Sequence, residues 1–200
     1  EALKLYGVKC FGLKFSGRKG FHIIIPFEAF PKEVGRKPIE TMFPEGPRMI
    51  ADFLGEKIYS KLSEMILKDQ KIEEICKLTK KPMEELTDSQ GNFNPFSVVD
   101  IDTILISSRH LFRSVYSINE KSWLVSIPID PEKLNEFKLR DAKIQNVKTD
   151  VPFFKIPKTE EARSLVIAAF DQSREKFIAE KKSTIVVEGK DPCSEENTQK

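Results

Sequence analysis

The sequence predicts an α/β or α+β fold in which a helical insertion lies between two parts of one sheet. Two short strand-like segments near the N-terminus flank a glycine-containing turn. A long stretch of helical periodicity follows, and two further strand-like segments come after it. The predicted strands are Val8–Phe15, His22–Phe27, Phe96–Asp102 and Leu124–Ile129.

Several segments show the apolar spacing of helices. From Arg48 to Lys68 apolar residues recur every three or four positions, with Lys and Glu on the opposite face. Lys71–Leu86 gives shorter helical signals, which Pro82 interrupts. The clearest late helix is predicted over Thr159–Lys182, and a further helix is expected from Thr103 to Arg113.

Composition excludes several classes of protein. With 33 basic and 31 acidic residues, the net charge of +2 is not that of a polybasic chain, so any nucleic-acid surface must be a local patch. Cys10, Cys76 and Cys193 form no C-x-x-C pair, which gives no support for zinc and favours a reducing compartment. No apolar run approaches a membrane span and no signal peptide is present, so we expect an intracellular protein without membrane contact.

Domain boundaries follow from the same signals. Residues 1–182 are predicted to form one domain, with the helical insertion at about residues 48–90. The polar composition of residues 183–200 predicts a disordered C-terminal tail. The sequence starts at Glu1, without Met, inside what reads as the end of a helix, so we expect a fragment whose upstream part is missing.

The segment Ser16–His22 (S-G-R-K-G-F-H) carries the densest chemistry in the chain. It reads as a tight turn between two strands, with two glycines, two cations, a hydroxyl group and a histidine. Glycine lets the backbone approach a ligand closely, and unpaired N–H groups in such a turn form an anion-binding concavity. The pattern is equally typical of a cradle for a nucleotide's phosphates and of an ordinary hairpin turn with solvated Arg18 and Lys19.

A second polar cluster begins with Asp100 and Asp102, at the end of a predicted strand. Carboxylate oxygens at such a point suit Mg²⁺ or Mn²⁺. If Thr103 starts a helix, His110 and Arg113 lie three residues apart on one face. The alternative is structural: Asp102 caps this helix and Arg113 makes a surface ion pair.

Together the two clusters resemble the small, catalytic subunit of the archaeal and eukaryotic DNA primases. That family has a motif S-G-x-x-G-x-H, a later Asp at a strand end, a segment like R/N-H-L-h-R/K-x-P-x-S-h-H-x-K-T-G, and a strand ending in V-P. This chain offers Ser16–His22, Asp102, Arg109–Lys121 and Val125–Ile129, in the same order, over roughly residues 1–150. The resemblance implies a primase-type catalytic core, with a central mixed sheet flanked by helices.

The resemblance also implies a role for each matching residue. Asp102, or alternatively Asp100, would be one carboxylate of a two-metal site for Mg²⁺ or Mn²⁺, and Asp102 and His22 would act in catalysis. The implied partners are nucleoside triphosphates, a single-stranded DNA template and a large primase subunit, in the cytoplasm of an archaeon or the nucleus of a eukaryote. The residues implied to bind the incoming nucleotide are Ser16, Gly17, Arg18, Lys19, His22, His110, Arg113 and Asn119.

The chain departs from the family's pattern at several positions. Asn119 replaces a phosphate-contacting histidine and cannot carry charge, and the K-T-G of the family is Lys121-Ser122-Trp123. No D-x-D motif, which would supply the other two metal-binding carboxylates, precedes Ser16. We therefore expect this chain alone to polymerise weakly or not at all. The alternative function is that of a noncatalytic subunit that binds nucleotides and nucleic acid.

Overall fold

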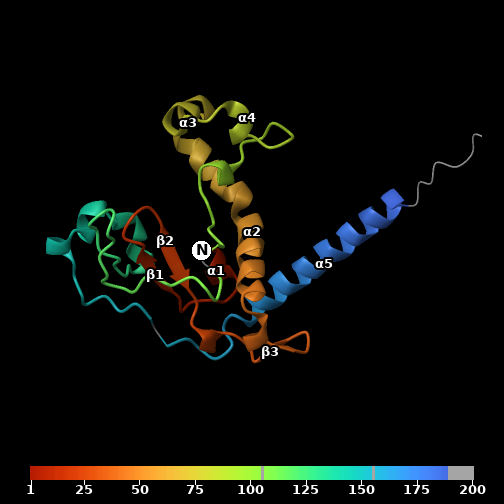
Figure 1. The fold of residues 1–200 in the computed structure, drawn as a ribbon, viewed down its shortest axis with the longest axis horizontal. Helices are drawn as coiled ribbons and strands as arrows, with labels where there is room; N and C mark the ends of the chain where they lie inside the picture. The colour runs from red at the N-terminus through yellow and green to blue at the C-terminus, as the bar shows by residue number, and fades with distance from the viewer. Residues whose placement is uncertain (105, 155, 189–200) are drawn as a thin grey trace, which may run out of the picture.

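The computed structural model describes residues 1–104, 106–154 and 156–188 and shows a mixed α+β fold (Figure 1). Its strands are short and antiparallel: β1 (Gly12–Phe15) pairs with β2 (Phe21–Ile24), and β3 (Glu33–Val34) pairs with β4 (Lys37–Pro38). The α-helices are α1 (Ala2–Leu5), α2 (Glu45–Asp69), α3 (Ile72–Thr79), α4 (Met83–Leu86) and α5 (Arg163–Glu188). Short 3-10 helices lie at Phe27–Ala29, Ile39–Met42, Pro95–Ser97, Pro131–Glu136, Leu139–Ala142 and Ile144–Asn146.

The long predicted helices are confirmed. Helix α2 covers the predicted segment 48–68, and Pro82 separates α3 from α4, as expected. Helix α5 runs to Glu188, past residue 183 where the predicted tail begins; residues 189–200 lie outside the described residues. Figure 1 shows α5 starting beside α2 and projecting away from the rest of the molecule. No described helix is both long and apolar enough to span a membrane.

The β1–β2 hairpin is joined by a segment from much later in the chain. The N–H of Phe15 donates to the carbonyl of Ile127 (N···O 2.9 Å), so the strand predicted at 124–129 lies extended beside β1, although it forms only isolated bridges. Residues 116–119 fold back on 124–126 through backbone hydrogen bonds of 2.7–2.9 Å, and we call residues 116–126 the second hairpin. A buried cluster holds these segments together: Leu13, Phe15, Val125, Ile127, Ile129 and Ala142.

A single central mixed sheet is not confirmed. The described residues form two separate two-stranded sheets and isolated bridges. The strand predicted at Phe96–Asp102 is wrong, because Pro95 starts a 3-10 helix there. The side-chain oxygen of Asn94 accepts the N–H of Phe96 (3.0 Å) and caps this helix, which curls the chain where an extended strand was expected.

The helix predicted from Thr103 to Arg113 is also wrong. The carbonyl of Ile104 is hydrogen-bonded to the ring of His110 (Nδ1···O 2.7 Å), and the carbonyl of Ile106 accepts from the guanidinium of Arg48 (2.9 Å). A helix would use these carbonyls for the N–H groups four residues further on. Here the side chains of His110 and Arg48 bond to these carbonyls instead, and the described residues of this segment form turns and bends.

Candidate functional site

The β1–β2 hairpin places Lys14 directly opposite His22. Because side chains alternate between the two faces of a strand, this pair projects from one face of the hairpin, while Phe15 and Phe21 project from the other. The rings of Phe15 and Phe21 lie 5.9 Å apart on the apolar side. The face that carries Lys14 and His22 is the candidate site, and we call it the polar face.

Lys14 is completely buried, which is rare for a lysine. Its ammonium group donates to the backbone carbonyl of Arg113 and to the hydroxyl of Ser126 (Nζ···Oγ 3.1 Å). The same group lies 4.2 Å from the centre of the Phe112 ring. Burial, and then repulsion from Arg113, lower the pKa of Lys14 from 10.5 to about 8. The side chain therefore ties the hairpin to the 112–113 segment.

His22 is half-buried under the same aromatic ring, with the His22 and Phe112 ring centres 5.1 Å apart. Burial and then the charge of Lys14 lower the pKa of His22; Asp102 acts in the opposite direction and Arg113 lowers it further. The Nδ1 atom is buried and has no hydrogen-bond partner among the described residues. Because buried polar atoms in proteins are nearly always hydrogen-bonded, this nitrogen is an unsatisfied group of the polar face.

The turn between the strands is closed by Ser16. Its N–H donates to the carbonyl of Gly20 (2.9 Å), and its hydroxyl oxygen accepts long hydrogen bonds from the N–H groups of Arg18 (3.4 Å) and Gly20 (3.3 Å). The Arg18 and Lys19 side chains are exposed at the tip of the turn. The turn therefore presents two exposed cations on a backbone that the Ser16 hydrogen bonds hold in shape.

Gly17 joins this turn to the second hairpin. Its φ is +88°, and a Cβ there would lie 3.1 Å from the Cβ of Asn119 and 3.2 Å from the carbonyl oxygen of Leu124. The hydroxyl of Ser122 donates to the Gly17 carbonyl (2.5 Å). Asn119 is buried, and its side-chain oxygen accepts the N–H of Lys121 (3.0 Å), which shapes the second turn. Glycine is thus required at position 17, both for its backbone angle and for the close approach.

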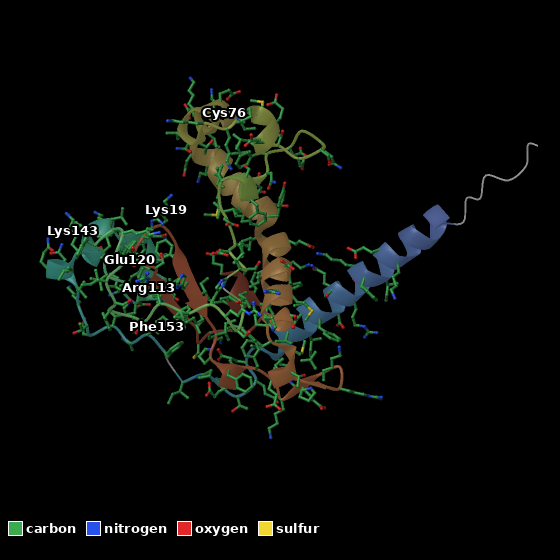
Figure 2. All side chains as sticks on the ribbon, in the orientation of Figure 1. Lys19, Cys76, Arg113, Glu120, Lys143 and Phe153 are labelled. Atoms are coloured by element: carbon green, nitrogen blue, oxygen red, sulfur yellow. The ribbon has the colours of Figure 1, made fainter. Side chains whose placement is uncertain are left out.

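Arg113 lies at the other edge of the polar face. Its guanidinium donates to the carbonyl of Ile118 (3.1 Å) and to the carboxylate of Glu120 (3.1 Å). Two hydrogen bonds lower the pKa of the Glu120 carboxyl group. The larger effect comes from the backbone N–H of Glu120 and the smaller one from Arg113. Figure 2 shows Lys19, Arg113 and Glu120 in the same lobe of the molecule, next to the β1–β2 hairpin. An anion bound here would compete with Glu120 for the Arg113 guanidinium.

The residues predicted from the 100–110 segment are exposed. The Oδ1 atom of Asp102 accepts the N–H of Ile104 (2.9 Å), and the charge of Asp102 acts on His22. The ring of His110 is hydrogen-bonded to the Ile104 carbonyl. Asp100 is exposed as well. The charges of Arg113 and Asp102 therefore both act on the imidazole of His22.

Within residues 1–104, 106–154 and 156–188, no three His, Cys, Asp or Glu side chains gather into a group that could hold a metal ion. Asp102 alone offers one carboxylate, whereas Mg²⁺ demands octahedral oxygen coordination. These residues do not fit the complete two-metal site that the sequence resemblance implies.

Sequence reasoning missed Lys14. A signal for Lys14 exists in the run G-L-K-F, where a lone cation interrupts an apolar strand immediately before the turn. Such a lysine is more often an exposed strand residue, so the pattern alone does not identify it. Its burial depends on Ser126 and the carbonyl of Arg113, which come from a segment about a hundred positions further along the chain.

Comparisons with known proteins add one finding. A family model described as the DNA primase small subunit matches residues 2–131. The matched range includes the Ser16–Gly20 turn, Asp102, Arg113 and the whole second hairpin. The search of curated proteins and the search of solved structures each gave no match.

Proposed function

Because the chain belongs to the DNA primase small-subunit family, we propose that the polar face of the β1–β2 hairpin binds the triphosphate of an incoming nucleotide. The full proposed function is primer synthesis on a single-stranded DNA template, by nucleotidyl transfer from nucleoside triphosphates. Enzymes of this family are generally nucleotidyltransferases. The proposal is therefore a specific version of the family's activity, placed on named residues of this chain.

The environment of His22 is the observation that carries this proposal. The imidazole has a buried Nδ1 with no hydrogen-bond partner in the part of the chain that the structure describes, and the cations Lys14 and Arg113 act on it. A phosphate oxygen would supply both a hydrogen-bond acceptor and negative charge at this point. Because a nearby anion favours the protonated form of an imidazole, binding of a triphosphate should raise the pKa of His22.

The remaining binding residues surround this histidine. We assign the phosphates to Ser16, to the Gly17 backbone and to Arg18 and Lys19, whose exposed side chains can close over an anion. Arg113 would join them by exchanging the carboxylate of Glu120 for a phosphate oxygen. The secondary assignments are His110 and Asn119, because each side chain already has a partner in its own segment.

The proposed reaction transfers a nucleotidyl group to a 3′-hydroxyl and releases pyrophosphate. A 3′-hydroxyl oxygen bonds to the α-phosphorus, the bond between that phosphorus and the bridging oxygen to the β-phosphorus breaks, and pyrophosphate leaves. The hydroxyl proton passes to solvent. Negative charge grows on the leaving pyrophosphate, and preorganised cations stabilise it most in a partly buried site. Arg113, with Arg18 and Lys19, would have this role, and His22 would share it once the bound triphosphate has raised its pKa.

Divalent ions are the family's cofactors, and Mg²⁺ or Mn²⁺ supplies charge stabilisation in nucleotidyl transfer. The described residues do not form a complete metal site. The proposal is therefore limited to Asp102 as one carboxylate ligand, with Asp100 as the alternative, and no step of the transfer is assigned to an ion. We prefer Asp102 because its charge reaches His22.

A noncatalytic subunit that binds nucleotides and single-stranded DNA is the second candidate function. The exposed, single carboxylate of Asp102 beside His22 favours it. Both candidates share the nucleotide site, a large primase subunit as expected partner, and an intracellular setting in DNA replication. An assay of primer synthesis on a single-stranded template separates them, because only the first candidate extends or initiates a strand.

Titration calorimetry with ATP tests the shared nucleotide site. His22→Ala and Arg113→Ala should each weaken ATP binding by about tenfold, since each removes a charge-assisted contact to phosphate. Arg140→Ala is the matched control: this guanidinium is exposed and lies 3.8 Å from the carboxylate of Asp141, in a separate 3-10 helix. Binding by both test variants that equals the wild type would show that the triphosphate lies elsewhere.

A further inference from the structure

Trp123 occupies an unfavourable position at the tip of the second hairpin. Its φ is +58°, in the left-handed region that glycine tolerates and bulky side chains avoid. Its indole is 70 % exposed, so it gains little from burial. Among the described residues no other aromatic ring packs against it. A strained and exposed large side chain is typical of positions that serve binding instead of folding.

The turn that carries Trp123 is fixed in place. The N–H of Trp123 donates to the carbonyl of Asn119 (2.9 Å), and the hydroxyl of the preceding Ser122 donates to the carbonyl of Gly17. The same hydroxyl oxygen accepts the N–H of Leu124 (3.3 Å). Since these bonds fix the backbone that carries Trp123 next to Gly17 before any ligand arrives, binding would not have to order this loop.

Both of the joined turns carry exposed cations. Arg18 and Lys19 come from the first turn, and Lys121 lies two residues before Trp123. None of these three takes part in the ion pairs found among the described residues. Their charges are therefore available to an anionic ligand that lies across the two turns.

We propose that Trp123 is a stacking platform for an unpaired nucleobase, with Arg18, Lys19 and Lys121 holding the phosphates next to that base. An aromatic face beside mobile cations is the arrangement that binds single-stranded nucleic acid with little sequence preference. The base belongs either to a single DNA strand or to the nucleotide itself, since every base has a π-face. This inference rests on the proposed function, because Arg18 and Lys19 belong to the proposed triphosphate site.

Intrinsic fluorescence gives a direct test, because Trp123 is the chain's only tryptophan. A stacked base quenches indole emission, whereas a phosphate contact to a neighbouring lysine does not. We expect oligothymidylate or ATP to quench the emission of the wild-type chain and inorganic tripolyphosphate to leave it unchanged. Quenching by the oligonucleotide assigns the base to a strand, and quenching by ATP assigns it to the nucleotide. Absence of quenching by both, or equal quenching by tripolyphosphate, would overturn the proposal.

Variants of Trp123 separate stacking from folding. Trp123→Gly relieves the left-handed backbone and removes the indole, so it should raise the melting temperature while weakening binding of the quenching ligand by about tenfold. Trp123→Phe should retain most of the affinity. Leu139→Ala, which removes another exposed apolar side chain, is the control and should bind as the wild type. Unchanged affinity in Trp123→Gly would contradict the stacking role.

The same measurements distinguish failure of this inference from failure of the proposed function. Loss of ATP binding in His22→Ala without any quenching of the wild type would leave the triphosphate site intact and remove the platform. Quenching by oligothymidylate in a chain that binds no ATP would keep the platform and remove the triphosphate site.

Discussion

The joined turns of the two hairpins and the segment 100–112 both carry residues of the candidate site, but they differ in how their polar groups are satisfied. In the turns, backbone and buried side chains bond to each other across about a hundred positions, as Lys14 does to Arg113 and Ser122 to Gly17. In the 100–112 segment, isolated bonds hold exposed residues, and Leu111 is 94 % exposed. Few buried contacts and exposed backbone mark a segment of low local stability.

This difference suggests that the two halves of the site have different dynamics. The half that we assign to phosphates is preformed, because Gly17, Asn119 and Ser122 fix its shape. The half with Asp102 has an exposed carboxylate on a loop, held by a single hydrogen bond from the N–H of Ile104. Substitutions in the joined turns should therefore change both stability and nucleotide binding, whereas substitutions of the exposed residues Asp100, Asp102 and Leu111 should leave stability almost unchanged.

The largest effect is expected from Gly17→Ala. The new Cβ would be strained at φ +88° and would press against Asn119 and the Leu124 carbonyl. We expect a loss of about 2–4 kcal/mol in the free energy of unfolding, from backbone strain and overpacking together, measured by urea denaturation. ATP affinity should fall as well.

Gly20→Ala is the matched control for this prediction. Gly20 lies in the same turn, but a Cβ there meets no atom within 4 Å. We expect a change within about 0.5 kcal/mol. If the two alanine variants were equally stable, the contact between the turns would not contribute to stability.

The next effect concerns the pH dependence that Lys14 produces. Lys14 titrates near 10.5 in the unfolded chain and near 8 in the folded one, so between these pH values the unfolded chain binds more protons. The free energy of unfolding contributed by Lys14 should therefore rise with pH across this window, by about 2–3 kcal/mol. Lys14→Met should remove this rise, as measured by urea denaturation of both proteins at pH 8 and pH 10. Parallel pH profiles of the wild type and Lys14→Met would show that Lys14 keeps its ordinary pKa.

The contrast between the two regions also explains what could be predicted from the sequence. The turn at Gly17 was predictable because its cause is local: two glycines lie between two apolar strands. The strand at 96–102 and the helix after Thr103 were not, because Asn94 and Arg48 bind backbone groups in ways that periodicity does not reveal. The burial of Lys14 depends on tertiary contacts alone.

A smaller effect is expected from Asp102→Asn in the 100–112 segment. The carboxylate of Asp102 raises the pKa of His22 against burial and the neighbouring cations, so its removal should lower the pKa of His22 further. NMR titration of the His22 ring protons measures this directly. Because the folded pKa lies below the unfolded value of 6.5, the contribution of His22 to stability is lost on acidification. In Asp102→Asn this loss of stability should extend to a lower pH than in the wild type. A His22 titration that did not move would place Asp102 too far away to act on the site.

The smallest effect is expected from Glu120→Gln, which tests whether Glu120 competes with the nucleotide for Arg113 or positions Arg113 for it. The ion pair between Arg113 and Glu120 is exposed on the Glu120 side, and such pairs add little to stability, so the melting temperature should not change measurably. Glu120 nevertheless competes with phosphate oxygens for the guanidinium and adds negative charge beside the proposed site. Removal of its charge should therefore tighten ATP binding by about twofold, measured by calorimetry at low salt. Weaker binding would instead show that Glu120 positions Arg113 for the nucleotide, and the pair would then belong to the preformed half of the site.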